Sequence, residues 1–188
     1  MTVALAAAGC GATSVRVALA PSIDTRRQLG FEATVSVAAG WPLDYHGQSR
    51  HYVQARTGVG GVIQQGSTGD PRPQWPHGPQ WIFRADLDSL HWALPRVDLR
   101  AGAGLARRFA SDGEGAGSSN GGSASWSAAG YFALLPVIHA NDGGHPAVRQ
   151  LCIGPELRAE ALFGDDGSRG GSFSLPLVVE LNLLMAGD

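Results

Sequence analysis

Arginine and carboxylate residues alternate with small or apolar residues in two stretches of the chain. Asp98 and Arg100 stand two positions apart, and Glu156, Arg158 and Glu160 repeat that spacing. Residues two apart in an extended strand point to the same face of a sheet. Paired carboxylates on one face could do acid–base chemistry if burial perturbed their pKa values. The intervening arginines instead favour a structural ion network, because a guanidinium can hold carboxylates through two parallel N–H groups.

A second pattern with chemical meaning is G-x-S-x-G, which residues 117–121 match formally. A nucleophile elbow needs a strand that turns sharply into a helix. Residues 113–125 are instead a Gly- and Ser-rich segment with no helical pattern after it, which predicts a flexible loop. We therefore expect no catalytic residue, metal or cofactor. An enzyme that acts on membrane lipid stays open as a less favoured alternative.

The composition limits the remaining classes of protein. The chain has 188 residues, of which 44% are apolar and 16% charged, so a single domain with a sizeable core is expected. All 14 basic residues are arginines, and the net charge is −2 without a basic stripe, which argues against nucleic acid as a partner. No apolar run reaches the length of a transmembrane helix. Two cysteines are too few for a disulfide-rich scaffold.

Gly, Pro, Asp and Ser clusters divide the chain into segments of strand length. Within these segments apolar and polar residues alternate with a period of two, which predicts strands. We therefore predict an all-β fold, an eight-stranded antiparallel up-and-down β-barrel with strands of about 9–11 residues, the length of a tilted bilayer crossing. The alternating stretches that indicate these eight strands are residues 15–19, 29–37, 53–64, 83–88, 97–105, 126–138, 151–163 and 173–183.

The polar face of these segments indicates which side is inside. Its arginines and carboxylates are nearly balanced, lysine is absent, and glycines such as Gly102 and Gly104 interrupt it. Glycine in mid-strand weakens a strand unless space is tight. These features are typical of a narrow barrel interior filled by side chains, which leaves the apolar face outward. The predicted interior ion network consists of Glu32, Arg84, Asp86, Arg96, Asp98, Arg100, Glu156, Arg158, Glu160 and Glu180.

The positions of the tryptophans are typical of aromatic girdles, which lie at the two interfaces of a membrane. Four of them, Trp41, Trp81, Trp92 and Trp126, fall at the ends of predicted strands, and Trp75 falls in a loop. Strand number, alternation and girdles together resemble the small eight-stranded outer-membrane barrels of bacteria, of the OmpA or OmpX type. The resemblance covers roughly residues 13–184. It implies a location in the bacterial outer membrane and outer-membrane lipid as a partner.

The first residues are predicted to lie outside the barrel. Residues 5–10, which end in Cys10, resemble a bacterial lipobox, in which small residues precede a cysteine that is lipidated after signal cleavage. Residues 1–12 are accordingly expected to be a signal-peptide remnant, a lipobox or a disordered tail. Residues 13–188 are expected to form the single barrel domain.

Three functions stay open at this point. The first is an outer-membrane barrel with a filled lumen and a structural role, or a surface or envelope partner bound through residues 65–80 and 110–125. The second is a soluble lipocalin-like barrel that holds an apolar ligand, in the periplasm or lipid-anchored. The third is the membrane-lipid enzyme. The first two differ in whether the apolar side chains face outward or inward.

Overall fold

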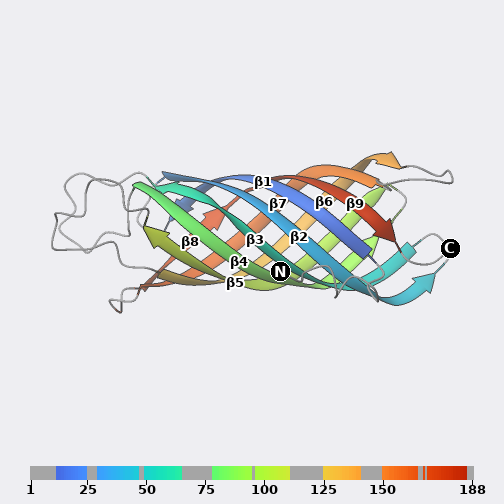
Figure 1. Cartoon of the computed structure of the whole chain (residues 1–188), viewed down its shortest axis with the longest axis horizontal. Coiled ribbons are helices and arrows are strands. Elements are labelled where there is room, and N and C mark those ends of the chain that lie inside the picture. The colour runs from blue at the N-terminus through green and yellow to red at the C-terminus, as the bar shows by residue number, and fades with distance from the viewer. Residues whose placement is uncertain are drawn as a thin grey trace, which may run out of the picture.

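A computed structural model shows one closed antiparallel sheet whose strands run obliquely to the long axis of the barrel (Figure 1). It describes residues 12–24, 29–46, 49–64, 78–94, 96–110, 125–140, 150–164, 167 and 169–185. The strands are β1 (Ala12–Asp24), β2 (Leu29–His46), β3 (Ser49–Gln64), β4 (Gly78–Ala93), β5 (Val97–Ala110), β6 (Ser125–Ala140), β7 (Gln150–Gly164), β8 (Arg169–Ser174) and β9 (Leu177–Met185). Strands β8 and β9 are two halves of the eighth strand of the barrel. The prediction of an eight-stranded antiparallel barrel is confirmed.

The barrel closes between its first and eighth strands. Strand β1 pairs with β2 on one side and with β8 and β9 on the other, and β7 also pairs with both halves. The break falls at Leu175 and Pro176, because proline has no N–H for the ladder. Two bonds bridge the break: Glu156 N–H donates to the Pro176 carbonyl over 2.9 Å, and Leu175 N–H donates to the Pro21 carbonyl over 3.3 Å.

The strands are longer than the predicted 9–11 residues, since the unbroken ones have between 13 and 18. Residues 39–50 and 89–95, which fall between predicted strands, lie largely within β2, β3 and β4. Register shifts between Pro42 and Asp44 and between Asp88 and Leu90 allow strand pairing to continue through these residues. A bulge of this kind inserts an extra residue while pairing continues on both sides.

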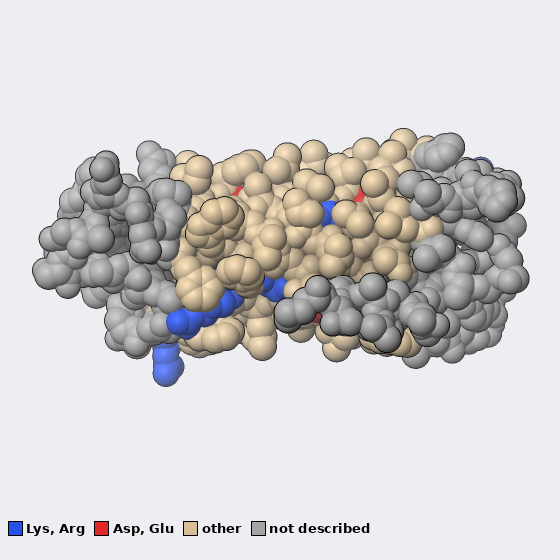
Figure 2. Space-filling view, in the orientation of Figure 1, with Lys and Arg blue, Asp and Glu red and all other residues tan. Residues whose placement is uncertain are grey.

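The two faces of the sheet differ sharply in composition. Outward-pointing strand residues, here called the outer wall, are mainly apolar, and many large side chains such as Val35, Phe83, Leu157 and Leu177 are exposed on it. On the face drawn in Figure 2 the described part of this surface is mostly uncharged, with a run of basic side chains toward the left and small blue and red patches elsewhere. Inward positions carry most of the described charged side chains. None of the described residues forms a helix long and apolar enough to cross a membrane.

Aromatic residues lie on the outer wall toward both ends of the barrel. Trp81 and Trp126 lie toward the end of the barrel at which residues 65–77 connect β3 to β4 and residues 111–124 connect β5 to β6. Trp41 and Trp92 lie toward the opposite end. All four tryptophans are exposed. Trp75 lies outside the described residues.

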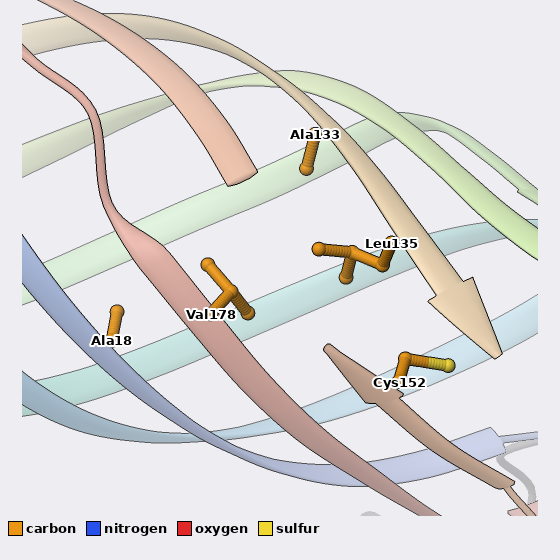
Figure 3. Packing of buried hydrophobic residues seen from close by; sticks show 5 residues of the cluster. All are labelled: Ala18, Ala133, Leu135, Cys152 and Val178. Carbon is orange, nitrogen blue, oxygen red and sulfur yellow. The ribbon is translucent and has the colours of Figure 1, made fainter. Parts of the chain in front are cut away.

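The interior also contains small apolar clusters between its charged groups. One consists of Ala18, Ala133, Leu135, Cys152 and Val178, whose side chains point into the space enclosed by the ribbons (Figure 3). A second consists of Val62, Ile82 and Ala106. Residues 126–138 are apolar on both faces, so alternation alone does not indicate which face of β6 points inward. Tyr131, Ala133 and Leu135 face inward there.

Glycines on β5 make room for the interior side chains. A Cβ on Gly104 would overlap an Asp86 carboxylate oxygen, and one on Gly102 would lie 2.6 Å from the Tyr131 hydroxyl. A cavity of about 20 Å³ between Ala18, Gly58 and the arginines has room for about one water molecule. Side chains therefore occupy most of the described interior around this cavity.

This tight packing predicts that Gly104→Ala destabilises the barrel. The new methyl group must displace the Asp86 carboxylate, and overpacking of this kind costs about 1–3 kcal/mol. Gly130→Ala is the matched control, because Gly130 is exposed on the outer wall and its added Cβ would meet nothing within 4 Å. Urea unfolding of the two variants in the same detergent measures the difference. Equal free energies of unfolding would contradict the packing argument.

Candidate functional site

The charged interior is the candidate site, and its first part surrounds Arg100. We call Arg100, Asp98, Glu180, Arg56 and Asp88 the Arg100 cluster. Arg100 donates to Asp98 through Nη2 over 2.5 Å and Nε over 3.2 Å, and its Nη1 lies 2.5 Å from Glu180 Oε1. Arg56 lies 3.2 Å from Asp88 and 3.4 Å from Glu180. Each of these five side chains is at most 2% exposed, so every charge depends on its partners rather than on water.

Further polar side chains contact the members of this cluster. The Gln54 amide oxygen accepts from Arg100 over 3.3 Å, and its nitrogen donates to the Ser14 hydroxyl over 3.1 Å. The Tyr131 hydroxyl donates to Asp88, and His91 Nε2 lies 2.9 Å from Asp98. Buried polar groups without partners are costly, so these contacts contribute to a single arrangement of the cluster.

Arg158 is the centre of the second part, the Arg158 cluster, which includes Arg16, Asp86 and Glu156. Arg158 binds Asp86 with both terminal nitrogens, over 3.2 and 2.9 Å, and donates from Nε to Glu156 over 3.0 Å. Arg16 binds the other oxygen of Glu156. The guanidinium of Arg158 also lies over the ring of Tyr131, 4.6 Å from its centroid, so Tyr131 connects this cluster to Asp88.

The third part, the Arg84 cluster, consists of Arg84, Arg108, Glu32 and Glu160. Arg84 lies 2.6 Å from Glu32 and 2.7 Å from Glu160, while Arg108 lies 2.7 Å from Glu160. Glu160 thus accepts from two arginines, one at each oxygen. Glu32 is the most exposed member, at 12% of its side-chain area.

Most of these ion pairs join strands that are not neighbours in the sheet. Arg158 on β7 binds Asp86 on β4, Arg84 on β4 binds Glu160 on β7, and Arg100 on β5 binds Glu180 on β9. Neighbouring strands are already held by the ladder, so pairs between distant strands add bonds across the lumen. They also fill the space through which a solute would pass.

Nine of the ten residues predicted for the interior ion network lie in these three clusters. The prediction for Arg96 is wrong: its side chain is exposed in the turn between β4 and β5. Val97 begins β5, and Leu94 N–H closes the turn on the Val97 carbonyl over 2.9 Å. Alternation inside β5 therefore places Asp98 and Arg100 in the lumen but does not extend to Arg96.

Sequence reasoning missed further members of the site. Arg16, Arg56 and Asp88 lie on the polar face of the predicted segments 15–19, 53–64 and 83–88, and simple alternation includes them, but the predicted network does not. Arg108 was missed because the predicted strand ended at residue 105. His91 was missed because residues 89–95 were interpreted as a break, and the register shift after Asp88 changes which residues face inward.

The chemistry of the site is that of charge pairing. Glu156 and Glu160, the carboxylates considered for acid–base work, each bind two arginines. No group of three or more metal-binding side chains occurs among the described residues. The arrangement can hold strands together and occlude the lumen. Cys10 and residues 117–121, the candidates for lipidation and for a nucleophile, lie outside the described residues.

Comparison with models of known protein families and with curated proteins gives no match for this chain.

The clusters predict that Arg100→Leu costs about 3–5 kcal/mol of unfolding free energy, because Asp98 and Glu180 lose their shortest cationic contacts while buried. Arg96→Leu is the control, since it removes the same charge from an exposed turn next to the same strand. Urea titrations followed by tryptophan fluorescence measure both. Losses of similar size would show that the interior charges are solvated.

Proposed function

We propose that this chain is a β-barrel of a bacterial-type outer membrane, with a lumen filled by paired charges and with a structural or surface-interaction role. The observation that carries the proposal is the inverted distribution of side chains: charges inside, apolar groups outside. A water-soluble barrel of this size needs the opposite arrangement, because burial of apolar area drives folding in water.

The extent of the apolar surface supports a lipid environment. Large exposed side chains occur on every strand, from Val17 on β1 through Phe132 on β6 to Val179 on β9. Monomeric soluble proteins rarely expose contiguous apolar patches larger than a few hundred Å². Exposed tryptophans toward both ends resemble the aromatic girdles that flank the apolar band of membrane barrels.

The connections between strands favour one orientation. Residues 65–77 and 111–124 connect strands at one end, whereas the start of β1 and the end of β9 lie at the other. Membrane barrels have longer loops outside the cell and shorter turns in the periplasm. We infer that the end carrying residues 65–77 and 111–124 faces the cell exterior, where these segments would contact a surface partner.

The filled interior argues for a structural role rather than for diffusion of solutes. Two ion pairs cross the lumen, one between Arg158 and Asp86 and one between Arg84 and Glu160. The filled interior also argues against the lipocalin-like alternative, which needs an apolar cavity. The described interior contains only small apolar clusters between charged groups.

Membrane insertion gives the first test. We expect the purified chain to require detergent, to refold into phospholipid vesicles, and to migrate faster in SDS before boiling than after it, because closed barrels resist SDS. Circular dichroism should show a β-rich spectrum both in detergent and in vesicles. A monodisperse folded protein in plain buffer would contradict the proposal.

Depth dependence gives a sharper test. Leu177 lies near the middle of the eighth strand and Phe173 lies nearer the β8 end, with similar exposures of 52% and 49%. Leu177→Arg should cost about 2–4 kcal/mol of unfolding free energy, since it places a charge near the bilayer midplane, and Phe173→Arg should cost less. Unfolding in vesicles of two thicknesses measures both. If both penalties were equal and independent of thickness, the outer wall would not contact lipid.

A further inference from the structure

The eighth strand of the barrel is interrupted between its two halves, β8 and β9. Residues 20–21 of β1 and residues 156–157 of β7 have no ladder partner in it. Prolines, which have no N–H for the ladder, occur on all three strands at this level: Pro21 on β1, Pro155 on β7 and Pro176 in the break itself. The hydrogen-bond ladder of the barrel wall is therefore locally thin on both sides of the break.

The two halves of this strand differ in how they are held from inside the lumen. Strand β9 carries Glu180, which binds Arg100 and Arg56 across the lumen. The inward positions of β8 are Gly170, Ser172 and Ser174, and none of the described ion pairs includes a residue of β8. Glycine within a strand weakens it further, because it has no side chain to pack. Strand β8 thus lacks the charge pairing that holds β9.

Strand β8 forms a hairpin with β7. Its six residues pair with residues 158–163, and in the turn Gly167, with a φ of 84°, donates its N–H to the Gly164 carbonyl over 3.0 Å. Of the two bonds that bridge the break, the one between β7 and the Pro176 carbonyl is 2.9 Å long, whereas the one to β1, which ends on the Pro21 carbonyl, is 3.3 Å long. A hydrogen bond weakens as it lengthens beyond about 3.0 Å. The junction between β1 and β8 is therefore the one that separates most easily.

The cavity in the lumen lies directly behind this break. Ala20 and Pro176 line it together with the guanidinium groups of Arg16, Arg84 and other arginines. Ion pairs across the lumen block passage along the barrel axis, whereas a gap between β1 and β8 would extend the cavity sideways to the outer surface. The break is thus a lateral approach to the charged interior.

We propose that β8 is a lateral flap, which parts from β1 while it stays paired with β7 and while β9 stays paired with β1. Leu175 and Pro176, at the break, are the hinge. Proteins open locally in cooperative units, and the units with the fewest stabilising interactions open most often. The flap opens the lumen cavity to whatever surrounds the outer wall. It depends on strand pairing and on the ion pairs alone, so it stands apart from the proposed location in a membrane.

Amide hydrogen exchange of the full chain in detergent, followed by peptide mass spectrometry, tests the flap. We expect the amides of β8 to exchange about tenfold faster than those of β9, after correction for intrinsic rates. Residues 126–131 of β6 are the matched control for fraying at the barrel end, because residues 158–163 of β7 pair with them on one side and with β8 on the other. These β6 amides should exchange as slowly as those of β9.

Two cross-links between β1 and the eighth strand give the second measurement. In a Cys10→Ala/Cys152→Ala background, Ile23→Cys/Phe173→Cys joins β1 to β8, and Leu19→Cys/Leu177→Cys joins β1 to β9. Each pair consists of ladder partners that are exposed on the outer wall. Dibromobimane, a short reagent that bridges two thiols, links each pair, and each linked form is compared with its own unlinked form. The mobility shift on boiling verifies that every variant is a closed barrel.

The first cross-link should slow exchange in β8 to the rate of β9, and the second should leave exchange in β8 unchanged. Equal exchange in β8 and in residues 126–131 would show ordinary fraying and would overturn the flap. An equal effect of both cross-links would show general stabilisation of the barrel, which would also overturn it. Exchange in β8 that stays fast in the first linked form would place the opening elsewhere and contradict the proposal.

Discussion

Pairing of arginine with carboxylate across the lumen is the interaction on which this barrel depends. The outer wall is apolar, and the lumen holds most of the described charged side chains. A charge buried there needs an opposite charge close by, because an unpaired buried charge is costly. Arg158 shows the requirement most clearly, because it binds Asp86 and Glu156 and stacks on Tyr131 at the same time. The geometry of the lumen is therefore set as much by electrostatics as by apolar packing.

This constraint explains features of the chain that otherwise have no common cause. Arginine rather than lysine suits the lumen because a planar guanidinium can bind two carboxylates at once, as Arg84 does with Glu32 and Glu160. Gly104 is required where the Asp86 carboxylate needs the space of a side chain. The described outer wall has few charged side chains, which leaves that surface able to contact lipid.

Sequence alone predicted which residues face inward but not which residues they bind. Period-two alternation assigns Asp98, Arg100 and Glu180 to the lumen. Their pairing depends on how far the sheet is staggered before it closes, which no local pattern encodes. Errors occurred where the strand path departs from a regular ladder: at Arg96 in a turn, at His91 beyond a bulge, and at Arg108 beyond the predicted strand end.

The central claim, that the apolar outer wall contacts lipid, is tested most directly by quenching of tryptophan fluorescence with brominated phospholipids. Trp41, Trp81, Trp92 and Trp126 are native probes exposed on the outer wall toward its two ends. In vesicles, lipids brominated near the headgroup should quench the emission strongly, and lipids brominated near the chain end should quench it less. Emission that is insensitive to brominated lipids at every depth would contradict the account.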